Sequence, residues 1–276
     1  IICDHVGYFG FDYGILEFLA DAKKRFLKAD GVTLPDSLEL MLAPIESPDC
    51  RKIVARWGDG TIPEEYGWVG SSAANTKHAA TLQANDVLAE AASLSKLKLG
   101  EDVPDYLSWD AGFSCERSAT LDGLAGWFRC RLFDAICMTN SPLADGALDR
   151  PQAFLPLPSP VDVSAGETIS ATVMVRPLDS VIGWVVELPD SGRRYTQSTF
   201  NGMELDSIAL SRANPARLAK LNDRGLARQL VLSYCDGTRT IAEVEALVET
   251  EHPDLFPSRY AIQSFVRSVL EWDTSS

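Results

Sequence analysis

The pattern of hydrophobic and polar positions divides the chain into three regions. From about residue 13 to residue 28, apolar residues recur at helical spacing, which predicts one amphipathic helix. From about residue 35 to residue 200, short apolar runs alternate with turn residues and prolines, which predicts mainly antiparallel β structure. After about residue 211 the helical spacing returns.

The first region is typical of the end of a doubly wound α/β unit. Residues 1–3 have the apolar character of the end of a buried strand, and a loop marked by Gly7 and Gly10 leads into the predicted helix. Basic residues near the C-terminal end of this helix stabilise it, because their positive charges interact favourably with the negative end of the helix dipole. Since the chain opens within a strand and not at a methionine, we expect further sequence upstream of Ile1.

The central region contains too many strands for one small sheet, which predicts a barrel or a sandwich. Its clearest strand covers residues 168–176, where Ile169, Ala171, Val173 and Val175 fall on one face. Between residues 73 and 94 the composition favours a helical insertion.

The last region predicts three short helices in a compact module. One helix covers residues 224–234, and a second opens at a capping box formed by Thr240 and Glu243. A third helix is expected after Ser258.

Charge narrows the class of protein. The 276 residues include 39 Asp and Glu against 25 Lys and Arg, which gives a net charge of −14. Such a chain is repelled by a phosphate backbone, so we expect no nucleic-acid partner.

No apolar stretch is long enough for a membrane helix and no signal peptide is evident, so we expect a soluble, cytoplasmic protein. Six scattered cysteines without a CxxC pair indicate neither a disulfide framework nor a metal site.

The first loop carries the candidate chemistry. Asp4 and Asp12 follow the C-terminal end of the predicted strand, where open α/β sheets bind ligands. Two carboxylates suit a guanidinium group, because each can accept paired hydrogen bonds from its planar fork of donors. The alternative is that Asp4 caps the loop and Asp12 caps the following helix.

Several motifs, in order, resemble the middle and C-terminal part of protein arginine methyltransferases. They are IICDHVGY at residues 1–8, DGVTLPD at 30–36, LDGLAGWF at 121–128, TNSP at 139–142, QAF at 152–154 and the strand to residue 177. The resemblance covers roughly residues 1–188. It implies an upstream half that holds S-adenosylmethionine, a β-barrel that forms the far wall of an arginine channel, and homodimerisation.

The resemblance also assigns candidate catalytic residues. Asp4 stands at the position of the family's first loop glutamate, and Tyr13 stands at the position of the second. Asp12 adjoins Tyr13 but would point about 100° away around a helix. The family's Thr-His-Trp loop corresponds to residues 148–150, which are Leu, Asp and Arg. Because the cofactor half lies outside this sequence, we do not expect the chain alone to bind S-adenosylmethionine well.

The C-terminal region has a second resemblance. The motifs LNDRG at residues 221–225 and CDGTRTIAEV at residues 235–244 resemble PqqD-type domains, which are small winged-helix-like modules that recognise leader peptides. The resemblance implies a leader-peptide partner. A DNA-binding winged helix is the alternative, and nine acidic against seven basic residues after residue 214 disfavour it.

The sequence therefore predicts an α+β protein in three parts. Residues 1–34 would be the remnant of a Rossmann-like methyltransferase domain, residues 35–210 a β-barrel substrate domain, and residues 215–276 a PqqD-like helical module. The predicted function is methyl transfer from S-adenosylmethionine to a polypeptide side chain when the cofactor half is present. The alternative is a non-catalytic peptide-binding or scaffold protein.

Overall fold

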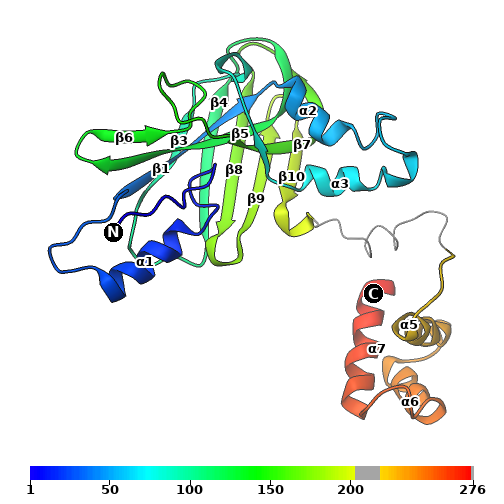
Figure 1. Ribbon diagram of the computed structural model, residues 1–276. Coiled ribbons are helices and arrows are strands. Elements are labelled where there is room, and N and C mark those ends of the chain that lie inside the picture. Colours follow the sequence, from blue (N-terminus) through cyan, green and yellow to red (C-terminus); the bar gives the residue numbers. More distant parts are fainter. Residues whose placement is uncertain (203–217, 275–276) are drawn as a thin grey trace. The chain divides into compact units, whose positions relative to one another are not determined.

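A computed structural model describes residues 1–202 and 218–274 of the chain (Figure 1). The chain forms two compact units, Ile1–Pro215 and Ala216–Ser276. The first unit combines helices with antiparallel sheets, and the described part of the second contains helices only. The domain limits expected at residues 210 and 215 lie outside the described residues.

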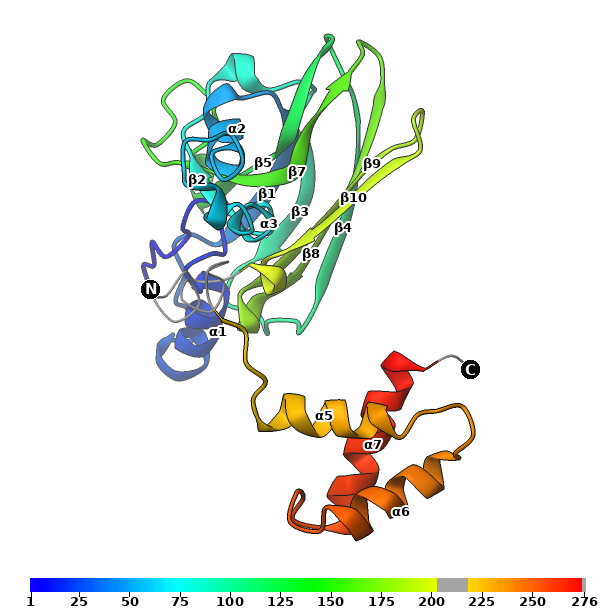
Figure 2. The ribbon, with the colours of Figure 1, turned by 90° about the vertical axis from the view of Figure 1, so that its right-hand side faces the viewer.

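Two antiparallel sheets form the first unit (Figure 2). The larger sheet has the order β2-β7-β5-β1-β3, with β6 paired to β5, and the smaller sheet has the order β10-β9-β8-β4. The strands are β1 (Ser37–Ile45), β2 (His78–Ala80), β3 (Ala92–Lys98), β4 (Leu107–Ser114), β5 (Ala119–Phe133), β6 (Ile136–Thr139), β7 (Gln152–Val163), β8 (Thr168–Arg176), β9 (Val181–Leu188) and β10 (Arg193–Ser198). Among the described residues no hydrogen-bonded ladder joins the two sheets, because the edge strands β3 and β4 are not paired. The described residues therefore show two antiparallel sheets and no closed barrel.

The alternation that predicts a strand at residues 168–176 is confirmed by β8. Its four apolar residues, Ile169, Ala171, Val173 and Val175, are buried, and the residues between them are exposed or half-buried. This period of two arises because successive side chains of a strand point to opposite faces of the sheet.

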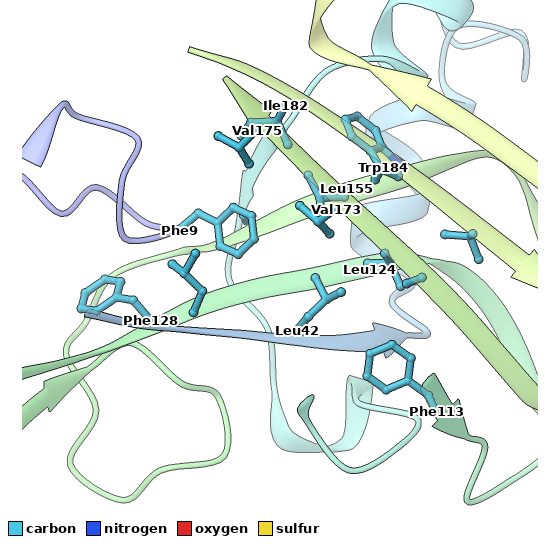
Figure 3. Packing of buried hydrophobic residues seen from close by; sticks show 14 of the residues in the cluster. Phe9, Leu42, Phe113, Leu124, Phe128, Leu155, Val173, Val175, Ile182 and Trp184 are labelled. Carbon is cyan, nitrogen blue, oxygen red and sulfur yellow. The ribbon is translucent and has the colours of Figure 1, made fainter. Parts of the chain in front are cut away.

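The core of the first unit lies between the two sheets (Figure 3). Leu42 and Leu124 come from the larger sheet, and Val173 and Trp184 come from the smaller one. The buried Nε1 of Trp184 donates a hydrogen bond to the carbonyl of Pro156 at 2.9 Å. This bond satisfies the indole N–H and joins β9 to β7 across the core.

The helix predicted near the N-terminus is confirmed by α1 (Ile15–Phe26). Ile15, Leu16 and Leu19 are buried, whereas Phe26 is exposed. Among the described residues, the strand end predicted before it takes the form of an isolated parallel bridge between Ile2 and Leu34, and Ile2 is 82% exposed rather than buried.

The helical insertion lies earlier in the chain than predicted. The helices are α2 (Pro48–Ala55) and α3 (Val69–Ala74), whereas residues 73–94 contain the end of α3, β2, a short 3-10 turn and the start of β3, joined by loops. Pairing with neighbouring strands overrides the helix propensity of this Ala-rich segment, since β2 pairs with β7 and β3 pairs with β1.

The second unit contains α5 (Asp223–Ser233), α6 (Ile241–Glu251) and α7 (Arg259–Asp273). These confirm the three predicted helices, and the capping box of Thr240 and Glu243 opens α6. Val231, Val244 and Val266 are central to a separate small core. The described residues of this unit include no strand, so a winged-helix fold is not shown. No helix in the described ranges is both long and apolar enough to cross a membrane.

Candidate functional site

The loop that leads into α1 is anchored in the core of the first unit. Phe9 is fully buried, and Figure 3 shows its ring within the core. The ring lies directly against Gly126 of β5. A side chain at Gly126 would collide with this ring, so glycine is required there by the close approach. The acidic residues of the loop therefore have a rigid support.

Asn140 ties the same loop to the segment that precedes β7. This fully buried side chain donates through Nδ2 to the carbonyls of Tyr8 at 2.8 Å and Pro151 at 2.7 Å. Its Oδ1 accepts a hydrogen bond from the backbone N–H of Phe128 at 3.0 Å. All of its polar groups are satisfied, so Asn140 fixes the distance between the two segments.

Asp4 forms an ion pair across the gap between these segments. An Nη2 of Arg150 lies 2.8 Å from Oδ2 of Asp4. The side chain of Asp4 is 65% exposed and that of Arg150 is 29% exposed. A carboxylate of the first loop therefore already binds a guanidinium group, at a place that solvent reaches.

Asp12 has a different environment. Its Oδ2 accepts hydrogen bonds from the backbone N–H groups of Tyr8, at 2.9 Å, and Phe9, and its Oδ1 forms an ion pair with Lys77. The side chain of Asp12 is 2% exposed and that of Lys77 is 14% exposed. The N-cap of α1 is Gly14, so the expectation that Asp12 caps this helix is wrong. Asp12 holds the loop itself.

Lys77 is placed by two neighbours. Its Nζ contacts Asp12 and lies 4.2 Å from the centre of the Tyr8 ring. Burial lowers the pKa of Lys77, and the adjacent carboxylate acts in the opposite direction by stabilising the ammonium. Burial also raises the pKa of Tyr8, with a smaller contribution from Tyr13.

The structure does not bring the three candidate residues into one acidic clamp. Asp4 pairs with Arg150, Asp12 pairs with Lys77, and Tyr13 is 58% exposed with its ring edge-on to Tyr8. The five principal cavities on the described residues are lined by other side chains. The two carboxylates thus occupy distinct environments on one loop.

The loop has no backbone N–H groups free for a cofactor at Tyr8 and Phe9, because both donate to Asp12. Gly7 has a φ of +61°, and a side chain there would meet Asp12 at 2.6 Å. The glycine therefore serves internal packing, and we derive no step through a cofactor from these residues.

Sequence reasoning missed three residues of this site, namely Lys77, Arg150 and Asn140. Their partners are 65, 146 and 132 residues away in the chain, so no local spacing indicates the contacts. Asn140 lies in the TNSP segment that carries the family resemblance, whereas Arg150 lies where the sequence departs from the family's Thr-His-Trp loop.

The two sheets and the loop define a fold of the protein arginine methyltransferase type. The structure of the Trypanosoma brucei PRMT1 enzyme-prozyme heterotetrameric complex with AdoHcy is similar at a TM-score of 0.61 and 12% identity, over 72% of this chain and 68% of that one. The structure of Arabidopsis thaliana protein arginine methyltransferase 10, described as a uniquely open conformation, is similar at a TM-score of 0.56 and 15% identity, over 72% and 70% of the two chains.

Sequence comparison adds no assignment. No family model matches the chain. No curated protein matches it either. At these identities the structural likeness shows the fold alone.

Proposed function

We propose that the first unit is the substrate-binding portion of a methyltransferase that uses S-adenosylmethionine and modifies a polypeptide side chain. The observation that carries the proposal is the ion pair between Asp4 and Arg150, on a fold similar to that of the arginine methyltransferases. A carboxylate that accepts the guanidinium of Arg150 has the chemistry needed to accept that of a substrate arginine.

Asp4 is the residue that would orient the substrate. Its ion pair is largely exposed, and such pairs contribute about 1 kcal/mol or less, so an incoming guanidinium can replace Arg150 at little cost. Asp12 would act as a positioning residue, because it holds the backbone of Tyr8 and Phe9. Tyr13 is exposed and would contact the substrate chain.

The proposal requires a separate cofactor-binding half, as the resemblance to the arginine methyltransferases implies. It keeps the expected division into residues 1–34, 35–210 and 215–276, with closure of the two sheets into a β-barrel. Homodimerisation and a cytoplasmic location also remain part of it. The trypanosomal neighbour forms a heterotetramer, which supports assembly of chains with this fold.

A second candidate is a non-catalytic peptide-binding or scaffold protein. Two observations favour it: Asp12 is paired with the buried Lys77, and Tyr13 offers no carboxylate. In this case the PqqD-like module would capture a leader peptide. The two candidates differ in whether methyl transfer occurs at all.

The deciding experiment supplies the full chain with a cofactor-binding methyltransferase half and an arginine-containing peptide. Labelled S-adenosylmethionine then reports methyl transfer, and calorimetry reports cofactor binding. We expect Asp4→Asn to abolish transfer and leave cofactor binding unchanged. The matched control is Asp179→Asn, which removes an exposed carboxylate paired with Arg176. Absence of transfer while the supplied half binds the cofactor would leave the scaffold as the function.

A further inference from the structure

Four basic side chains gather on the outer face of the larger sheet, on the strands β3 and β5 that flank β1. Strand register places Lys96 of β3 and Arg129 of β5 opposite the same β1 residue, Glu39. Lys98 and Arg131 form a second row two residues further along. The four side chains are exposed, because the alternate residues of these strands face the core.

The four cations line a shallow hollow of about 420 Å³, which we call the basic groove. Glu39 is the single acidic residue in its lining. The groove thus carries four positive charges and one negative charge, in a chain whose net charge is −14. A basic groove on an acidic protein is not explained by the average composition of its surface.

Glu39, in the middle of the groove, presents less negative charge to a ligand than the sequence indicates. The carboxylate of Glu39 is only 17% exposed and accepts a hydrogen bond from the Ser93 hydroxyl at 2.7 Å. It also lies 3.5 Å from the ammonium of Lys96, so its charge is directed toward β3. Arg129, on the other side, makes no ion pair within the described part of the chain.

The other two cations have partners that a ligand can replace. Arg131 binds Asp36 through two hydrogen bonds of 2.9 and 2.6 Å, and its side chain remains 54% exposed. Lys98 lies 3.4 Å from Glu101, and both side chains are more than half exposed. Both pairs are open to solvent, which screens them, so carboxylates of a ligand can compete for the cations.

We propose that the basic groove binds an extended acidic peptide segment. Alternate side chains of an extended strand are about 6.6 Å apart. This spacing separates Lys96 from Lys98 and Arg129 from Arg131, and it also separates alternate side chains of an extended peptide. A peptide lying along β1 with acidic residues at alternate positions would meet Lys96 and Lys98 on one side and Arg129 and Arg131 on the other. The arginine guanidinium groups supply paired hydrogen bonds to carboxylates.

Charge decides against a nucleic acid as the ligand. Long-range repulsion by the net charge of −14 acts on every phosphate of a polynucleotide, whereas a short peptide carries only a few charges. The groove is independent of the proposed methyltransferase site, because it shares no residue with the Asp4 and Asp12 loop.

The test measures fluorescence anisotropy of a labelled peptide in which Glu alternates with Ser, titrated with the full chain. The variant combines Lys96→Gln with Arg129→Gln, and the matched control is Arg193→Gln on exposed β10. We expect the double variant to weaken binding about tenfold, since two exposed charge contacts of about 0.7 kcal/mol each are lost. A peptide with Gln in place of Glu should not bind.

Cys137 provides an independent measurement. It is exposed and lies opposite Arg131 in the register of β5 and β6, so bound peptide should slow its alkylation. Equal binding by the double variant, equal binding of the Gln peptide, or no protection of Cys137 would overturn the proposal. If a single-stranded oligonucleotide binds more tightly than the peptide, the ligand of the groove is a polyphosphate and the proposal is overturned. If the wild-type chain self-associates and the double variant does not, the groove binds a second copy of the chain and the proposal is likewise overturned. Circular dichroism confirms that each variant is folded.

Discussion

Two aspartates of the first loop each pair with a basic residue from a distant segment of the chain, in opposite environments. Asp12 and Lys77 are buried at 2% and 14% exposure, and Asp4 and Arg150 are exposed at 65% and 29%. Burial raises the cost of separating two charges, whereas solvent screens an exposed pair. The comparison teaches that Asp12 serves structure and Asp4 is available for exchange with a ligand.

The largest effect should follow from Asp12→Ala. This change leaves Lys77 buried without its carboxylate and removes the acceptor of two backbone N–H groups. We expect the free energy of unfolding to fall by about 3–5 kcal/mol, measured by urea denaturation. Adding Lys77→Met should recover part of the loss, because the uncompensated charge is then absent. A loss below about 1 kcal/mol would mean that the pair is not buried in solution.

A smaller effect on stability should follow from Arg150→Ala. Breaking the exposed pair should lower the free energy of unfolding by about 1 kcal/mol or less. The freed Asp4 should then bind free arginine more tightly, which calorimetry can measure. Arg176→Ala removes another exposed pair and serves as the control, since it should leave arginine binding unchanged. Unchanged arginine binding in Arg150→Ala would count against exchange at Asp4.

The smallest expected effect on stability comes from Glu46, whose side-chain exposure lies between that of the buried Asp12–Lys77 pair and that of the exposed Asp4–Arg150 pair. The backbone N–H of Thr120 and then Arg117 lower the pKa of Glu46 below its ordinary value of 4.5. The folded state therefore holds this carboxylate ionised after the unfolded state has begun to take up its proton. The resulting stability is present above the ordinary pKa and is lost as the pH falls through the lowered value.

This sign can be checked by urea denaturation at a series of pH values. The wild-type chain should exceed Glu46→Gln in stability by about 1 kcal/mol or less at neutral pH. The difference should shrink on acidification below about pH 4.5, as the carboxylate takes up its proton. A difference that grows on acidification would contradict the assignment.

Sequence predicted the parts of the fold that local periodicity determines. The alternation of β8, the apolar stripe of α1 and the capping box of α6 are all local, and each is confirmed. The error at residues 73–94 has a non-local cause, because strand pairing with β7 and β1 decides that segment.

The candidate site divides in the same way. The loop acids Asp4 and Asp12 could be found from their position after an apolar run. Their partners Arg150 and Lys77 could not, because they come from distant segments of the chain. The burial that distinguishes the two acids also depends on tertiary packing, so sequence alone could not assign their different roles.

The contact between Phe9 and Gly126 has a consequence for the timescale on which a ligand can replace Arg150 at Asp4. A loop whose aromatic ring is locked in the core can open only if that ring leaves it, which is a collective and slow motion. Exchange at Asp4 needs only the half-exposed Arg150 side chain to change rotamer, a motion of picoseconds to nanoseconds in exposed residues. Access to the carboxylate is thus limited by the rotation of one side chain, with the backbone remaining still.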